Sequence, residues 1–151
     1  MQDQSQGMER RMVHRLLMHW REAQTDDRHP ELEDLMMRDL GDVASHLYVL
    51  EIDDEREEPF FERIGGAYAK EGTIKLVGRS VSDVPENTLL GQAAHYFSRV
   101  QVKQIPITRG GEFTHNSGDV ILYRSIIMPL LDSEGEDRFL VGAANFKVKE
   151  E

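Results

Sequence analysis

Apolar residues near the start of the chain recur at the three- and four-residue spacing of one helix face. They are Met8, Met12, Val13, Leu16, Leu17 and Trp20. The pattern predicts an amphipathic helix from Met8 to Ala23. The polar stretch that follows ends in Pro30, and proline predicts a stop because it cannot continue a helix. A second, shorter helix is predicted from Glu31 to Leu40, with Gly41 marking its end.

Two segments with strand character come next. His46 to Ile52 and Pro59 to Ile64 are rich in β-branched and aromatic residues, and the acidic turn Asp53 to Glu58 separates them. Together they predict a β-hairpin. The stretch after the hairpin is interrupted by Gly65, Gly66, Gly72 and Gly78, so short helical turns are expected there.

A second amphipathic run, Glu86 to Gln104, predicts one long helix that ends before Pro106. Ser82 or Asp83 is a candidate cap for its entry, and Pro85 suits a first helical turn. Three strands are predicted after it: Pro106 to His115, Val120 to Leu131, and Phe139 to Val148. In the last strand, Gly142 and the alanines beside it indicate that another group approaches the backbone closely.

The length of 151 residues fits one domain, which at this size buries about 68 to 70 per cent of its unfolded surface. We expect a flexible N-terminus at 1–7, an N-terminal helical cap at 8–40 and a core at 41–151. The predicted fold class is α+β, because a helix followed by three strands lies across an antiparallel sheet. A cavity between such layers is a common ligand or partner site, which favours a sensor over an enzyme.

Composition removes several kinds of chemistry. The chain has no cysteine, which excludes disulfides, thiolate metal sites, a cysteine nucleophile and a cysteinyl flavin adduct. Its net charge of -10 repels phosphate backbones, so nucleic acid is not an expected partner. Residues 1–7 lack the pattern of a signal peptide and no apolar run approaches the roughly 20 residues of a membrane span, so we expect a cytoplasmic protein.

Charge is unevenly distributed along the sequence. Arginines gather in the first predicted helix, at Arg10, Arg11, Arg15 and Arg21, whereas acidic residues gather in the turn at 53–58. A solvated surface is the simpler interpretation of both clusters. The alternative is that the basic helix face docks an acidic partner.

Several short motifs occur in a fixed order over residues 12–146. They are His19-Trp20-Arg21 followed by Pro30, YVLEID at 48–53, FERIGG at 61–66, VGRS at 77–80, YRSIIMPLLDSEG at 123–135 and LVGA at 140–143. In this order and spacing they resemble the PAS domain family, in particular an alphaproteobacterial stand-alone group with a Trp-bearing N-terminal helix. The resemblance implies a PAS-like five-stranded antiparallel sheet with helices on one face, plus the N-terminal amphipathic helix.

The resemblance also implies a role. Domains of this kind are sensory or regulatory modules that signal through contact with another signalling protein, and a small ligand between helices and sheet can modulate them. Catalysis is not expected. The family's flavin photoreceptors and photoactive chromoproteins need a cysteine that this chain lacks, so the cofactor stays unknown. Haem would need a pocket histidine, and His95 is the candidate; a single helix histidine is far more often a polar-face residue, so haem is not expected.

Candidate ligand contacts follow from the predicted elements. They are Arg63, Tyr68, His95, Tyr96, Tyr123 and Arg124. Arg124 interrupts an apolar row of alternate strand positions, so it either pairs with a carboxylate or faces the pocket and binds an anion. The structural pair is favoured, and Arg63 poses the same choice. The six histidines are scattered without metal-binding spacing, so no metal site is predicted.

The apolar stripe of the first helix is a candidate dimer or partner interface. Its residues are Met12, Val13, Leu16, Leu17 and Trp20. The stripe is wider than a short helix on a sheet edge needs, so we predict a homodimer through this helix. The simpler alternative is that the stripe packs entirely on its own domain.

Two other functions compete with the sensory module. One is a small α+β cone-fold enzyme in which His95 and Asp119 act as acid and base. Strand order separates it from the PAS arrangement, which places the first strand centrally beside the last. The other is a structural adaptor whose own side chains fill the pocket.

Overall fold

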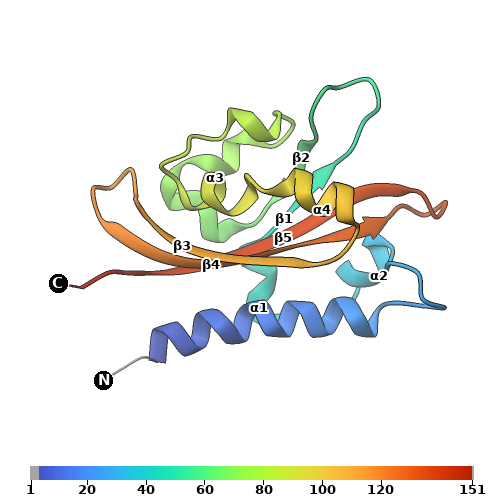
Figure 1. Cartoon of the computed structure of the whole chain (residues 1–151), viewed down its shortest axis with the longest axis horizontal. Coiled ribbons are helices and arrows are strands. Elements are labelled where there is room, and N and C mark those ends of the chain that lie inside the picture. Colours follow the sequence, from blue (N-terminus) through green and yellow to red (C-terminus); the bar gives the residue numbers. More distant parts are fainter. Residues whose placement is uncertain (1–3, 151) are drawn as a thin grey trace.

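Five antiparallel strands in the order β2-β1-β5-β4-β3 form one sheet, and helices cover both of its faces (Figure 1). The computed structural model describes residues 4–150, with side chains from residue 11 onward. The strands are β1 (Leu47–Glu51), β2 (Phe60–Ile64), β3 (Ile107–Thr114), β4 (Val120–Leu131) and β5 (Asp137–Val148). β1 lies inside the sheet beside β5, which is the strand order expected of the PAS arrangement and not of the cone fold.

Helices divide between the two faces of the sheet. One face carries α1 (Gln4–Glu22) and α2 (Leu32–Met36), and the other carries α3 (Leu89–Ala94) and α4 (Phe97–Lys103) (Figure 1). Four short 3₁₀ segments complete the order: η1 (Gly41–His46), η2 (Gly66–Glu71), η3 (Thr73–Leu76) and η4 (Val81–Asp83). None of the described helices is long and apolar enough to cross a bilayer.

α1 packs its apolar face on β4 and β5. Leu16 is fully buried, and the Trp20 indole Nε1–H donates to the Pro129 carbonyl at 2.8 Å. This bond satisfies the one polar atom of a buried indole and fixes the helix along the strand. The helix begins at Gln4 rather than at the predicted Met8, and residues 1–3 of the predicted flexible N-terminus lie outside the described residues.

The second helix is shorter than predicted, covering only Leu32–Met36. Leu32 and Leu35 are buried in the core that α1 forms with the sheet. Beyond the helix, Arg38 turns back toward α1, where its Nε donates to His19 Nδ1 at 2.9 Å and its guanidinium pairs with Glu22. These tertiary contacts replace the extra helical turn that the sequence pattern predicted.

The prediction of one continuous helix over Glu86 to Gln104 was wrong. The segment is divided into α3 and α4 by a turn at His95 and Tyr96. His95 Nδ1 lies 2.8 Å from the Gln92 carbonyl. The turn aims Tyr96 at the sheet, where its hydroxyl lies 2.8 Å from Ser125 Oγ. A straight helix follows local periodicity alone, whereas this contact depends on a strand that is 29 residues away in sequence.

The contact between Tyr48 and Gly142 explains why the last strand has a glycine at this position. The two residues are directly opposite in the β1–β5 pairing, and the Tyr48 ring lies over Gly142. A Cβ at Gly142 would come within 2.2 Å of the ring, so no larger residue fits without displacing Tyr48. The prediction of a close approach at this glycine is therefore confirmed, and the approaching group is Tyr48.

We expect Gly142→Ala to lower the free energy of unfolding by about 1–3 kcal/mol, because overpacking displaces a fully buried ring. Urea denaturation measures the change. Gly66→Ala is the matched control, because its backbone φ is ordinary and nothing lies within 4 Å of its added Cβ. Equal effects of the two substitutions would contradict the assignment.

Candidate functional site

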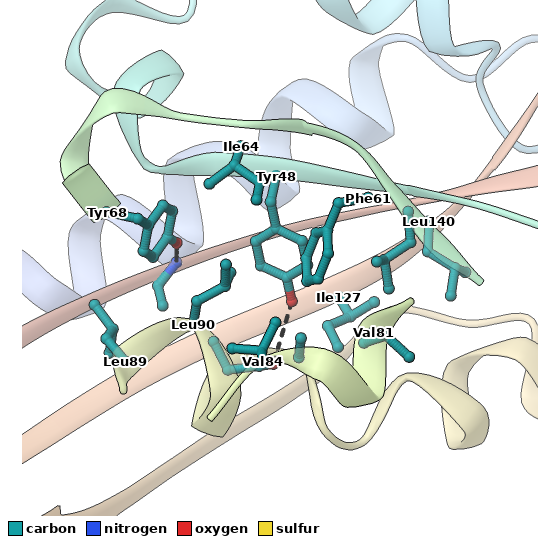
Figure 2. Close-up of a cluster of buried hydrophobic side chains, with 14 of the residues drawn as sticks. Tyr48, Phe61, Ile64, Tyr68, Val81, Val84, Leu89, Leu90, Ile127 and Leu140 are labelled. Carbon is teal, nitrogen blue, oxygen red and sulfur yellow. Dashed lines mark hydrogen bonds between the residues drawn. The ribbon is translucent and has the colours of Figure 1, made fainter. Parts of the chain in front are cut away.

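The space between the sheet and α3 is filled by side chains that come from most of the elements around it (Figure 2). Tyr48, Phe61 and Leu90 are fully buried there. Tyr48 packs edge-on against Phe61 and Tyr68, with ring centroids 6.0 and 6.3 Å apart. Its hydroxyl donates to the Ala93 carbonyl of α3 at 3.2 Å. One residue thus joins β1, β5 and α3.

Tyr68 forms a second connection within this core. Its hydroxyl donates to the His46 carbonyl at 2.7 Å and accepts from the Ala144 amide at 3.1 Å. His46 precedes β1 and Ala144 belongs to β5. Because β1 pairs with β5 only as far as Leu47 and Ala143, the Tyr68 hydroxyl continues the connection where the backbone pairing ends.

Tyr96 and Tyr123 lie toward the β3 side of the same face. The Tyr96 hydroxyl shares a hydrogen bond with Ser125 Oγ, and the Arg109 guanidinium stacks 5.2 Å from the Tyr96 ring centre. Tyr123 packs edge-on against Phe113 at 5.8 Å. The hydroxyls of Tyr48, Tyr68 and Tyr96 are therefore all bonded within the chain.

The environment of these phenols opposes their ionisation. Burial raises the pKa of Tyr48 well above its ordinary value, and the neighbouring Tyr96 and Tyr68 add to the effect. Burial also raises the pKa of Tyr68 and of Tyr96, and hydrogen bonds from Ala144 and with Ser125 offset part of each rise. Burial likewise raises the pKa of Tyr123, opposed by the charge of Arg109. The tyrosines are neutral hydrogen-bonding and packing groups.

The structure does not bring all six predicted ligand contacts together. Tyr68, Tyr96 and Tyr123 lie on the α3 face, whereas the alternation of β4 places Arg124 on the α1 face, where its side chain runs beside Gly110. Arg63 is exposed, forms two hydrogen bonds to the neighbouring Glu62, and lines a separate surface cleft of about 330 Å³ near α2. His95 is exposed at the turn between α3 and α4.

The acid–base pair of the enzyme alternative is not supported. His95 is held to the Gln92 carbonyl on the outer side of the helix turn. Asp119 is exposed in the turn between β3 and β4, where it accepts from the Ser117 hydroxyl. Among the side chains that the structure describes, residues 11–150, no three or more metal-ligating groups form a cluster.

Glu71 is a central residue that sequence reasoning missed. Its carboxylate accepts from the amides of Leu89 and Leu90 at 2.7 and 2.9 Å, the first two of α3. It also lies 2.9 Å from His115 Nε2, and only 6% of its side chain is exposed. His115 Nδ1 accepts from the Ser117 amide, which leaves Nε2 to donate to Glu71.

Thr88 completes the start of α3. Its Oγ1 accepts from the Gly91 amide at 3.0 Å, so Thr88, rather than the predicted Ser82 or Asp83, is the cap. Glu71 satisfies the amides of Leu89 and Leu90, which Thr88 leaves open, and a negative charge is favourable at a helix N-terminus. Glu71 precedes these amides by 18 and 19 residues, which is why no short motif reveals it.

The stripe of α1 faces its own sheet. Met12, Val13, Leu16 and Trp20 are buried, and Leu17 is half-buried against the same cluster. While α1 keeps this position, these side chains are not available to a second copy. Homodimerisation itself stays a prediction.

Comparisons with solved structures agree with the strand order and layers. The LOV domain of the blue-light-activated histidine kinase EL346 from Erythrobacter litoralis is 13% identical, with a TM-score of 0.50 over 69% of this chain and 96% of that domain. The PAS domain of BvgS from Bordetella pertussis is 18% identical, with a TM-score of 0.50 over 72% of this chain and 79% of that one. The chain has the PAS fold.

Sequence comparison gives no closer assignment within that fold. No protein-family model matches the chain, and no curated protein matches it significantly. The PAS likeness therefore concerns architecture, and the alphaproteobacterial stand-alone group of the sequence resemblance stays a prediction. Function has to be argued from the side chains, because one fold supports many activities.

We expect Tyr48, Tyr68 and Tyr96 to stay protonated above pH 10 as long as the protein is folded. Unfolded tyrosines release their protons at a pKa of about 10, so these groups leave stability unchanged below that pH and lower it as pH rises further. Tyrosinate absorbance and circular dichroism, recorded on the same samples, measure both events. Full tyrosinate absorbance with native circular dichroism would contradict the buried, bonded hydroxyls.

Glu71→Gln should lower the free energy of unfolding by about 2–3 kcal/mol, because hydrogen bonds to a buried charge are lost or weakened. Glu112→Gln is the matched control, since Glu112 forms an exposed ion pair with Lys149 and should change stability by no more than about 1 kcal/mol. Denaturant unfolding measures both variants. A Glu71→Gln protein as stable as the control would show that the carboxylate does not hold α3.

Proposed function

We propose that the chain is a sensory or regulatory PAS module that acts by contacting another signalling protein. The observation that carries contact, rather than ligand binding, as the mode of action is that the core beneath α3 is occupied by its own tyrosines, as the adaptor alternative also expects; their hydroxyls are bonded to Ala93, His46, Ala144 and Ser125. A small ligand would have to displace these bonded rings to bind there. Contact at the surface requires no such rearrangement.

The fold also supports a signalling function. The EL346 domain belongs to a blue-light-activated histidine kinase, which is a signalling protein. Here the core provides rigid links between layers, since Tyr48 ties β1 to α3 and Glu71 ties η2 to α3 and to the end of β3. A contact that moves β1 or η2 can therefore alter the position of α3. No catalytic step is part of the proposal, and a cytoplasmic location remains its expectation.

Native mass spectrometry followed by reconstitution tests this function. We expect the freshly purified protein to have the mass of the polypeptide alone, as a monomer or as the predicted dimer. We also expect a partner captured from the source cells to bind the purified protein in calorimetry and to change its own activity on binding.

A different result would overturn the proposal. If a small molecule copurifies stoichiometrically and no cellular protein binds with or without it, the chain is a ligand carrier. Tyr48→Ala is the informative variant for that outcome, because it opens space in the core while leaving the surface unchanged. Its equilibrium stability has to be measured first, since removing a buried aromatic ring costs about 3–5 kcal/mol.

A further inference from the structure

A surface cleft of about 480 Å³ lies between α1, η1 and β5. It is on the face of the sheet opposite the tyrosine core, the buried cluster beneath α3 that contains Tyr48, Tyr68 and Tyr96. Its walls come from Arg11, His14 and Arg15 of α1, His46 of η1 and Asn145 of β5. Met12, only 2% exposed, provides apolar floor. None of these residues has a part in the core beneath α3, apart from the backbone carbonyl of His46.

Charge in the cleft is opposite to that of the whole chain. The chain carries -10 with histidines counted as neutral. On the same count, Arg11 and Arg15 against the one carboxylate, Asp42, give this depression a formal charge of +1. The carboxylate in the cleft, Asp42, is already paired with Arg15 at 3.0 Å. The Arg15 guanidinium lowers the pKa of Asp42, first through the hydrogen bond and then through its charge. A local cationic site on an acidic protein directs an anionic partner to this position and away from the rest of the surface.

The shape of the cleft fits an extended segment better than an enclosed small molecule. Arg11, His14 and Arg15 form an exposed rim, while His46 and Asn145 are partly buried. Small-molecule sites enclose most of their ligand, whereas peptide and protein interfaces combine a buried apolar centre with a solvent-accessible polar rim. From this charge and shape we infer that the cleft is the docking site for an acidic segment of the partner protein. The inference rests on the proposed function and adds that the docking segment of the partner is acidic.

The cleft is also connected to the tyrosine core through Tyr68. The two partly buried walls, His46 and Asn145, adjoin the two backbone groups that the Tyr68 hydroxyl holds, the His46 carbonyl and the Ala144 amide. Movement of either wall therefore strains a bond inside the core on the opposite face. Tyr68 is a positioning residue for the docking site and does not contact the partner.

Fluorescence anisotropy with a fluorescein-labelled hexaglutamate peptide tests the docking site on the full chain. We expect saturable binding that weakens as salt is raised, because exposed charges are screened beyond about 8 Å at 0.15 M ionic strength. Arg11→Glu should weaken binding about tenfold by reversing the charge of the rim. Lys75→Glu is the matched control, since it makes the same change in net charge at an exposed residue of η3 and should leave affinity within about twofold.

Two variants test the connection between the cleft and the tyrosine core. Tyr68→Phe removes the bonds to the His46 carbonyl and to the Ala144 amide beside Asn145, whereas Tyr48→Phe removes a buried hydroxyl bond to α3 without touching either wall. We expect peptide affinity to fall several-fold in the first variant only. Equal affinities, measured at equal folded fraction, would overturn the positioning role.

Three results of the peptide experiment would overturn the docking site. One is no saturable binding at millimolar peptide, and another is equal weakening by Arg11→Glu and Lys75→Glu. The third is displacement by citrate at equal carboxylate concentration, which would make the cleft a site for small anions. A concentration-dependent dimer that Arg11→Glu dissolves would instead make the acidic loop at 53–58 of a second copy the occupant, and would also overturn the proposal. A cellular partner that Arg11→Glu still retains would contradict this site and leave the proposed function standing.

Discussion

The antiparallel pairing of β1 with β5 is the contact on which the rest of the structure depends. It joins Leu47–Glu51 to residues 139–143, so it closes a loop that contains most of the chain. Loop closure of that size is entropically unfavourable, and burial on both faces of the paired strands offsets it. Tyr48 and Leu50 face the tyrosine core, while Leu47 and Val49 face α1. Both layers of helices are therefore built on the same pair of strands.

This arrangement gives the two faces different properties. On the α3 face, tyrosine hydroxyls find partners inside the chain, and the buried carboxylate of Glu71 holds the helix that covers them. On the α1 face, the helix leaves an open cationic cleft beside the end of β1. Tyr68 connects the two, because its hydroxyl spans the point where β1 and β5 separate. A closed core with an open surface site on the opposite face suits a module that responds to contact.

The PAS fold alone does not lead to the proposed function. Solved domains with the same architecture share less than a fifth of their residues with this chain, as the 13% and 18% identities show. What distinguishes the chain is how it fills the space beneath its helices. Large tyrosines take that space and are fixed by bonds to the backbone, so the choice between a ligand pocket and a packed core is made by side chains and not by topology.

The sequence pattern was sufficient to predict the elements that depend on residues close together in the chain. Alternation predicted β4, β-branched runs separated by an acidic turn predicted the β1–β2 hairpin, and three- and four-residue spacing predicted α1. The glycine opposite Tyr48 was also visible, because a glycine inside a strand marks a close approach. These features depend on residues near one another in the chain.

Only the tertiary structure decided the rest. The division of the predicted long helix depends on Tyr96 reaching Ser125, and the start of α3 depends on Glu71, 18 residues earlier in the chain. The apolar stripe of α1 looks the same whether it packs on its own sheet or on a second copy, so periodicity could not choose between them. The cationic cleft likewise needs α1, η1 and β5 side by side. Local patterns fix which face of an element is apolar, but what covers that face is set by long-range packing that no window of the sequence contains.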